Sequence, residues 1–336
     1  MTFSSPSLDS LLGQMAVVSI PLETDFRGIR HREVALLSGP NGPGEWAAFT
    51  EYDDEEAAWW LLAALEQAFG DEVSLPAGPI PVNAIVPALP AEQVAPWLER
   101  FRGVTAVKVK IAQAGESLRD DIARVREVRR VCGDEVLLRL DVNAAWDVDT
   151  AAQAINGLSK FSLDYVEQPV ATSPEMRELA DRLGGRVRLA ADELIRRSRS
   201  LELVEEGVCD IAIIKPSPLG GYARAVSLAS EALERSLEVV VSSALETSVG
   251  LTRAASVAGW VNATTGKNTP HGLATAALLS SDVTEKPLLP QGGAIHPHPL
   301  RLDPETIGRL QAPSDKVEWW RARLERCLPR ALELAG

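Results

Sequence analysis

Hydrophobic and polar positions divide the chain into two regions with different rhythms. In the first eighty residues, alternating patterns predict extended segments at residues 15–22, 31–37 and 46–52, with a turn at residues 41–44. An acidic first turn, an apolar run and a closing glycine predict a helix over residues 53–69. These patterns favour a small α+β capping domain at residues 1–80.

From residue 82 onwards, short apolar runs alternate with helical patterns, which predicts parallel strands joined by helices. The runs lie at residues 82–87, 106–111, 136–142, 163–168, 187–192, 211–215, 237–242 and, with a weaker pattern, 270–273. Eight runs favour a (β/α)8-type barrel as the catalytic domain, at residues 81–285. An open doubly wound sheet is the alternative, but no glycine-rich phosphate turn follows the first run.

Two smaller features complete the predicted architecture. One of the helices between the runs is expected at residues 200–206. The C-terminal segment, residues 286–336, has proline-rich loops and a helix from Asp315, and we expect it to return to the capping domain. Two tryptophan pairs are expected to pack between the capping domain and this segment: Trp59 with Trp60, and Trp319 with Trp320.

Polar side chains recur where the apolar runs end. Catalytic residues of such barrels lie at the C-terminal ends of the strands. Lys108 and Lys110 are two residues apart, so one face of their strand carries both. The next run places Arg139, Asp141 and Asn143 on one face in the same way. The sequence therefore predicts a polar cluster at one end of the barrel.

The following runs end in Glu167, Asp192 and Lys215. Each residue lies about one strand-plus-helix unit after the previous one, so consecutive strands carry Asp, Glu, Asp and Lys at equivalent positions. Three converging carboxylates repel one another unless a cation joins them, and hard oxygen ligands suit Mg²⁺, for which Mn²⁺ can substitute. The spacing predicts a divalent metal site.

The lysines flank this predicted metal site. A substrate carboxylate bound to the metal would bring its α-carbon between Lys110 and Lys215, and the metal would acidify the α-proton. A lysine with a lowered pKa can remove that proton. Lys108, beside Lys110, would lower the pKa of Lys110 by like-charge repulsion.

Several segments together resemble a known family. They are K-V-K at 108–110, L-R-L-D-V-N at 138–143, V-E-Q-P at 166–169, A-D-E at 191–193 and I-K-P-S-P-L-G-G at 214–221. The chain resembles the enolase superfamily, in its muconate-cycloisomerase-like branch. Within that branch it is most similar to o-succinylbenzoate synthases of the actinobacterial type, through S-S-A-L-E-T-S-V-G-L at 242–251 and T-P-H-G-L at 269–273.

The resemblance implies a role for each matching residue. The Mg²⁺ ligands would be Asp141, Glu167 and Asp192. Lys110 would be the base, Lys215 would stabilise the enediolate from across the substrate, and Lys108 would tune Lys110. Arg139 and Asn143 would support the metal ligands. The implied reaction is a syn-dehydration that forms o-succinylbenzoate during menaquinone biosynthesis.

The substrate-binding residues and the reaction itself stay open at this point. Phe26, in a loop expected over the site, would shield the substrate from water. Ser242 and Ser243 would hold its second carboxylate with backbone N–H groups at the start of the following helix. The same two lysines would also serve an N-acylamino acid racemase or a dipeptide epimerase. A non-catalytic barrel that binds an acidic metabolite is a third reading, against which the intact set of carboxylates and lysines argues.

Composition narrows the class of protein further. The formal net charge of −13 disfavours nucleic acid as a partner, and no apolar run approaches the roughly 20 residues of a membrane span. Three scattered cysteines and a segment without Lys or Arg before Arg27 favour a cytoplasmic protein. The expected partner is a small-molecule carboxylate. The oligomeric state is not encoded in any pattern, and a monomer is plausible.

Overall fold

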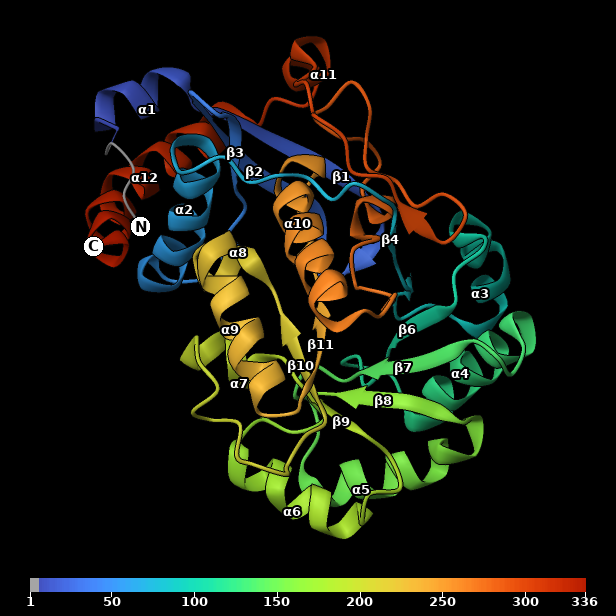
Figure 1. Cartoon of the computed structure of the whole chain (residues 1–336). Helices are drawn as coiled ribbons and strands as arrows, with labels where there is room; N and C mark the ends of the chain where they lie inside the picture. The colour runs from blue at the N-terminus through green and yellow to red at the C-terminus, as the bar shows by residue number, and fades with distance from the viewer. Residues whose placement is uncertain (1–5) are drawn as a thin grey trace.

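The computed structural model describes residues 6–336, so the first five residues of the predicted capping domain lie outside the described part. Two sheets organise the chain (Figure 1). An antiparallel sheet near the N-terminus lies beside the helices α2 and α12, and a parallel sheet with surrounding helices forms the larger part.

The antiparallel sheet has the order β1-β2-β3, with bounds Ala16–Phe26, Ile29–Gly39 and Gly42–Trp46. Helix α1 (Leu8–Gln14) precedes it and helix α2 (Asp54–Phe69) follows it. Asp53 caps α2 by accepting a hydrogen bond from the Glu56 amide at 2.8 Å, as the acidic first turn predicted.

The third predicted strand is misplaced in the sequence interpretation. We expected residues 46–52 to be extended, but β3 begins at Gly42 and ends at Trp46. Beyond Trp46 the backbone leaves the sheet, because the Ala47 carbonyl accepts a hydrogen bond from the Arg32 side chain rather than from a strand. Phe49, two residues further along the chain, is buried.

The C-terminal helix α12 (Ser314–Ala335) returns to α2, as expected. Trp320 is fully buried and its ring packs edge-on against Trp46, with centroids 4.9 Å apart. Trp60 instead packs against Phe49 and Tyr52 inside the N-terminal part. Trp60 and Trp320 therefore both pack within the capping region. The ring of Trp320, however, contacts Trp46 and not the expected Trp59–Trp60 pair. The exact limits of the three predicted domains stay a prediction.

The parallel sheet runs in the order β11-β10-β9-β8-β7-β6-β5. Its strands are β5 (Ala84–Val86), β6 (Ala106–Lys110), β7 (Leu137–Asp141), β8 (Leu163–Glu167), β9 (Leu189–Ala191), β10 (Ile211–Ile214) and β11 (Glu238–Val241). The helices between and after them are α3 (Ala91–Leu98), α4 (Leu118–Cys132), α5 (Val148–Leu158), α6 (Ser173–Leu183), α7 (Glu193–Ser198), α8 (Pro216–Leu219), α9 (Tyr222–Glu234) and α10 (Ser248–Thr265). No helix is found at residues 200–206, where we expected one.

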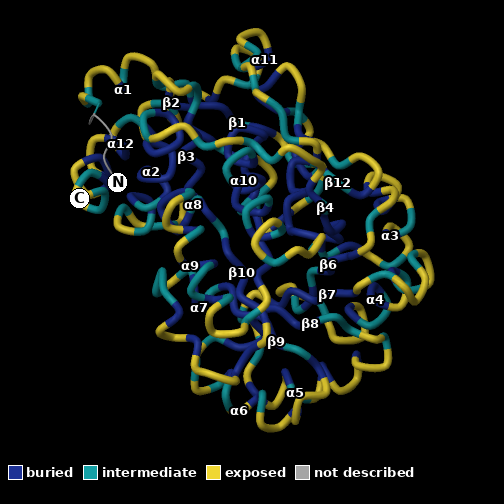
Figure 2. Tube along the Cα trace, viewed as in Figure 1, coloured by how far each residue is buried: buried dark blue, intermediate teal, exposed yellow. Residues whose placement is uncertain are grey.

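Isolated bridges close the ring in place of a regular eighth strand. His271 pairs in parallel with Val82, just before β5, and Gly272 pairs with Ser242, just after β11. The predicted strand at residues 270–273 is therefore reduced to two bridges, but it joins the first strand to the last. The strands are buried, while the helices present exposed outer faces (Figure 2). The fold is thus a curled parallel barrel beside an α+β capping sheet.

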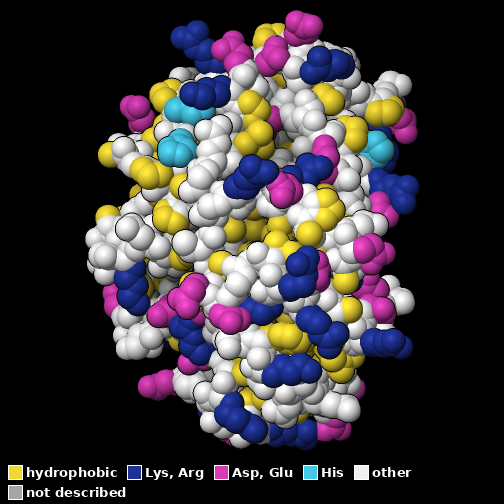
Figure 3. Space-filling model, turned by 90° about the vertical axis from the view of Figure 1, so that its right-hand side faces the viewer, with side chains coloured by type: hydrophobic (Ala, Val, Ile, Leu, Met, Phe, Trp, Pro, Cys, Tyr) yellow, Lys and Arg dark blue, Asp and Glu magenta, His cyan; other side chains and the backbone are white. Residues whose placement is uncertain are grey.

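The tail crosses from the barrel to the capping sheet. Its strand β12 (Ala294–Ile295) pairs with β4 (Ile80–Pro81), and α11 (Pro304–Arg309) precedes α12. Within residues 6–336, no helix is long and apolar enough to cross a bilayer. Basic and acidic side chains are interspersed on the face turned toward the viewer in Figure 3.

Candidate active site

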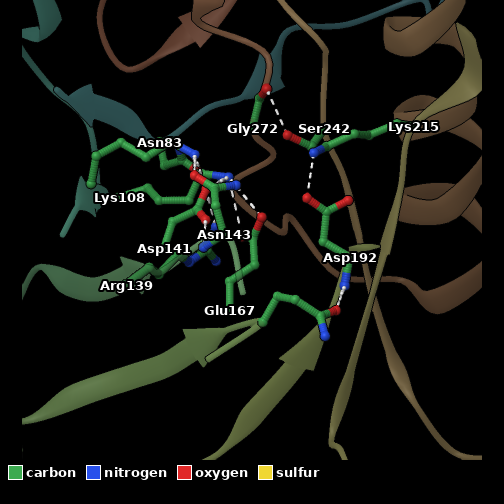
Figure 4. Close-up of polar contacts among 12 residues, drawn as sticks. Asn83, Lys108, Arg139, Asp141, Asn143, Glu167, Asp192, Lys215, Ser242 and Gly272 are labelled. Carbon is green, nitrogen blue, oxygen red and sulfur yellow. Dashed lines mark hydrogen bonds and ion pairs between the residues drawn. The ribbon is translucent and has the colours of Figure 1, made fainter. Parts of the chain in front are cut away.

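Strand register gathers the predicted residues at one end of the barrel. Lys110 pairs with Asp141 between β6 and β7, and Asp141 pairs with Glu167 between β7 and β8. Asp192 directly follows β9, and Lys215 directly follows β10. Because parallel strands end at a common edge, these five side chains share the C-terminal mouth of the barrel. Figure 4 shows Asp141, Glu167, Asp192 and Lys215 there.

Ion pairs connect each lysine to a carboxylate. Lys110 Nζ lies 2.6 Å from Asp141 Oδ2, and Lys215 Nζ lies 2.5 Å from Asp192 Oδ2. Lys108 Nζ lies 3.2 Å from the same Asp141 oxygen and 3.1 Å from Glu167 Oε2. All three carboxylates are at most 2% exposed, so the mouth is a compact, alternating set of buried charges.

The two candidate catalytic lysines differ in their electrostatic surroundings. Burial and the neighbouring Lys108 lower the pKa of Lys110, although Asp141 opposes them. Burial also acts to lower the pKa of Lys215, but Asp192 and Glu167 more than offset it, so that this pKa is raised. Lys110 is therefore the better proton acceptor, and Lys215 is held as a cation.

Burial disfavours the ionised form of the carboxyl groups at the barrel mouth and so acts to raise their pKa values. Burial, and then the charge of Asp141, raises the pKa of Glu167 to about 8. Burial similarly acts on Asp192, but Lys215 lowers the pKa of that carboxyl below its usual value. Glu193 lies beside this set, and burial and Asp192 raise its pKa. A divalent cation would relieve the repulsion that acts on Glu167.

The donor chemistry fits a hard divalent cation, because all three candidate ligands are carboxylates on neighbouring strands. Within residues 6–336, no three carboxylate, imidazole or thiolate groups are gathered tightly enough to form a metal-binding group as they stand. Lysine ammonium groups neutralise the carboxylates instead. Asp141, Glu167 and Asp192 can hold a metal when their oxygens exchange lysine contacts for metal contacts.

The two predicted supporting residues lie at different depths. Asn143 has a left-handed backbone (φ +52°); its side-chain oxygen accepts from Lys110 at 2.6 Å, and its amide donates to Glu193 at 3.0 Å. Arg139 lies deeper in the barrel. It donates to Asp164 Oδ2 (2.9 Å), Asn83 Oδ1 (3.1 Å) and the Pro270 carbonyl (2.6 Å). Arg139 thus contacts residues beneath the mouth rather than the three carboxylates.

A pocket opens over the lysines. Phe26, Ser242 and Ser243 line it, and Lys110 Nζ lies 5.6 Å from the centre of the Phe26 ring. Phe26 does not lie in the expected loop, because it ends strand β1 and pairs with Ile29 of β2. The serine amides, however, donate to the carbonyls of Ile214 and Gly272. Helix α10 begins only at Ser248, so these serines do not sit at a helix start. Their role as carboxylate ligands stays a prediction.

Several pocket residues escaped the sequence interpretation. The capping domain contributes Arg27, Phe49, Tyr52 and Trp60, and α7 contributes Arg196. Glu193 also lines the pocket and did carry a usable signal, because it follows Asp192 directly at a strand end. The capping residues follow no spacing rule, since their position depends on how the sheet docks on the barrel.

Comparison with known proteins identifies the family. Residues 91–304 match the model "Enolase C-terminal domain-like", and residues 17–68 match "Enolase N-terminal domain-like". The chain is 40% identical over 334 residues to an o-succinylbenzoate synthase of Mycobacterium ulcerans, covering 98% of both chains. It is also 40% identical over 331 residues to an o-succinylbenzoate synthase of Mycolicibacterium smegmatis, covering 97% of this chain and 99% of the relative.

Solved structures show the same fold at low identity. A muconate cycloisomerase variant superposes with a TM-score of 0.71 and 17% identity, covering 89% of this chain and 98% of the other. The L-Ala-D/L-Glu epimerase from Bacillus subtilis superposes with a TM-score of 0.68 and 20% identity, covering 86% and 96%. Together, the two domain matches and the full-length relatives show that the chain belongs to the enolase superfamily, where it groups with the o-succinylbenzoate synthases.

Proposed function

We propose that the chain is an o-succinylbenzoate synthase. It would dehydrate 2-succinyl-6-hydroxy-2,4-cyclohexadiene-1-carboxylate to o-succinylbenzoate in menaquinone biosynthesis. The observation that carries this proposal is the 40% identity to o-succinylbenzoate synthases over 98% of the chain. The unequal lysines and the buried carboxylates at the barrel mouth give the chain the groups that this reaction needs.

Asp141, Glu167 and Asp192 are the proposed ligands of Mg²⁺, and Mn²⁺ would be an alternative. Members of the enolase superfamily generally depend on a divalent metal. A divalent cation bound there would polarise the substrate carboxylate and acidify the hydrogen on the adjacent carbon. Asn143 would keep Asp141 and Lys110 in place, because it hydrogen-bonds to both.

Lys110 is the proposed base. Its neutral amine takes the α-proton, and the electrons of the broken C–H bond move into the substrate carboxylate. Lys215 and Lys108 remain ammonium ions and stabilise the developing negative charge. The electrons then return to form the ring double bond as the C–O bond breaks. Lys110 gives its proton to the leaving hydroxide, so one molecule of water departs from the same face and the ring becomes aromatic.

Arg27 is the proposed main partner of the second substrate carboxylate. Arg196 is a proposed secondary contact, because it is already ion-paired with Glu56 at 2.8 Å. Both line the pocket and both contact Tyr52. Arg27 Nη2 donates to the Tyr52 hydroxyl at 3.3 Å, and the Arg196 guanidinium lies 5.2 Å from the Tyr52 ring centre. A dicarboxylate bound at the mouth needs such cations at its far end. Their guanidinium groups carry positive charge, whereas the amides of Ser242 and Ser243 already donate to backbone carbonyls.

N-acylamino acid racemisation or dipeptide epimerisation on the same site is the second candidate. These reactions need one base on each face of the substrate. The carboxylates that set the pKa values of Lys110 and Lys215 are the proposed metal ligands, so these pKa values do not choose between the two reactions. Dehydration is favoured by the identity to o-succinylbenzoate synthases.

A substrate panel separates the two candidates. Purified protein with Mg²⁺ is offered the cyclohexadiene carboxylate, N-succinylamino acids and dipeptides, and Lys215→Arg is tested in parallel. We expect the cyclohexadiene to have the highest kcat/KM. We also expect Lys215→Arg to keep part of the dehydration while losing any racemisation. Racemisation without dehydration would overturn the proposal in favour of the second candidate.

A further inference from the structure

One wall of the pocket has a backbone that needs support from outside. Residues 242–245 line the pocket between β11 and α10. Within this wall, Leu245 is 1% exposed and has a φ of +66°, in the left-handed region that a leucine rarely adopts. Such a conformation persists only where neighbouring groups hold it.

Arg32 of the capping domain supplies such contacts. It lies in β2, is 2% exposed, and donates from Nε to the Leu245 carbonyl at 3.1 Å and from Nη2 to the Ala244 carbonyl at 3.3 Å. Its guanidinium also covers the Phe49 ring, with 3.9 Å between the guanidinium carbon and the ring centre. One buried side chain of the capping sheet thus holds two successive carbonyls of the pocket wall.

Glu45, in the neighbouring strand β3, holds the other end of the same segment. Its carboxylate accepts from the Thr247 amide at 2.9 Å, the Thr247 hydroxyl at 2.6 Å and the Gly250 amide at 2.7 Å. These groups belong to the start of α10, so Glu45 fixes where that helix begins. The approach is close, since a Cβ on Gly250 would lie 3.1 Å from Glu45 Oε2 and 2.7 Å from Glu246 Cβ.

Glu246 completes the cluster from within the wall segment. It is 2% exposed and accepts from the Ala244 amide at 2.5 Å and from the Ser217 hydroxyl at 2.7 Å. Glu246 and Glu45 both act electrostatically on Arg32 and oppose the effect of its burial. Burial, and then the charge of Glu246, raises the pKa of Glu45 to about 8, so the charges of Arg32, Glu45 and Glu246 depend on one another.

We propose that Arg32 and Glu45 are positioning residues through which the capping sheet fixes the pocket wall at residues 242–245 and thereby sets the affinity for substrate. This inference rests on the proposed function for its substrate. Neither residue lines the pocket, so neither acts on the reacting atoms. They act through the backbone that the substrate meets.

The chain offers a matched control for this role. Glu66, on α2, is a second buried carboxylate of the capping domain that accepts from the first turn of a barrel helix, here from the amides of Tyr222 and Ala223 in α9. It does not line the pocket. Substitution of Glu66 therefore weakens the same domain interface by the same chemistry without touching the wall segment.

The test compares Arg32→Lys, Glu45→Gln and Glu66→Gln in the full chain. Lysine keeps the buried positive charge that the two glutamates need, which favours folding, but one ammonium cannot reproduce the fork of a guanidinium. We expect Arg32→Lys and Glu45→Gln to raise KM for the cyclohexadiene carboxylate about tenfold, with kcat changed less than about threefold, the pattern of lost uniform binding. Glu66→Gln should leave KM unchanged.

Hydrogen exchange gives a second readout that does not depend on activity. Amides of residues 243–250 should exchange faster in Arg32→Lys and Glu45→Gln than in the wild type, whereas in Glu66→Gln the faster exchange should be confined to the start of α9. An unchanged KM, or unchanged exchange in residues 243–250, would overturn the positioning role. Absence of turnover by the wild type would instead contradict the proposed function, and the exchange data alone would then decide the positioning role.

Discussion

At the residue scale, identical side chains acquire different chemistry from their neighbours. Lys110 has a second lysine beside it and a lowered pKa, whereas Lys215 faces Asp192 and Glu167 and has a raised pKa. Period-two spacing was enough to predict that Lys108 and Lys110 share a face. The difference between Lys110 and Lys215 was not predictable in full, because it depends on burial and on contacts across several strands.

Replacing the proposed base should greatly slow turnover without unfolding the protein. We expect Lys110→Ala to lower kcat by about 10²–10⁴-fold, the range for a lost general base. Lys267→Ala is the control, because Lys267 is an exposed lysine paired with Glu238 at the surface. Steady-state kinetics on both variants check this. Near-normal kcat in Lys110→Ala would exclude it as the base.

His271 should make stability depend on pH. Burial lowers the pKa of His271 from 6.5 to about 3, and its Nδ1 accepts from the Val241 amide at 3.0 Å. The fold requires the neutral ring. The contribution of His271 to the free energy of unfolding is therefore fully present above pH 6.5 and is lost by about 1.4 kcal/mol per pH unit as the pH falls toward 3. Between pH 7 and pH 5, the free energy of unfolding measured in urea should therefore fall by about 2 kcal/mol more in the wild type than in His271→Asn. Equal losses would contradict this.

At the element scale, the repeating strand-helix unit was predictable and its irregular parts were not. Asp141, Glu167 and Asp192 recur once per unit, so their meeting followed from the spacing. The predicted strand at residues 46–52 failed because Arg32 takes the Ala47 carbonyl. The contact between Arg32 and Leu245 spans 213 positions and leaves no local pattern to detect.

Two helical glycines should respond oppositely to alanine. In α10, a Cβ on Gly250 would meet Glu246 Cβ at 2.7 Å, so Gly250→Ala should destabilise the chain by about 1–3 kcal/mol through overpacking. In α5, Gly157 has open space around its Cβ position, so Gly157→Ala should stabilise it by about 0.5–1 kcal/mol. Thermal unfolding of the two variants checks both signs. A stable Gly250→Ala would mean that Glu45 and Glu246 can move apart.

At the scale of the whole molecule, the capping sheet and the barrel form one functional unit. Glu56 of α2 is paired with Arg196 at 2.8 Å and with Arg199, both from the barrel. Glu45 and Glu66 of the capping domain likewise accept hydrogen bonds from amides at the starts of the barrel helices α10 and α9, respectively. The pocket therefore has a barrel floor and a capping-domain roof. This explains why barrel spacing alone predicted the meeting of the candidate lysines and carboxylates but not most of the residues that enclose the pocket.

Metal binding should stabilise this unit. A cation that binds the folded chain alone raises the free energy of unfolding by about 2.7 kcal/mol at one hundred times its Kd. We expect Mg²⁺ to raise Tm in the wild type and in Asp134→Asn, an exposed control, but much less in Asp192→Asn. Thermal scans with Mg²⁺ and with chelator test this. A Tm that does not respond in the wild type would favour a barrel that binds a metabolite without metal chemistry.

The most direct test of the central claim is turnover of 2-succinyl-6-hydroxy-2,4-cyclohexadiene-1-carboxylate by the purified chain, followed as loss of diene absorbance. The reaction is run with Mg²⁺, then with excess chelator, then with Mg²⁺ restored. We predict fast loss of the diene with Mg²⁺, arrest by the chelator and recovery on restoring the metal, with o-succinylbenzoate as the product. Absence of diene loss in the presence of Mg²⁺ would contradict the account.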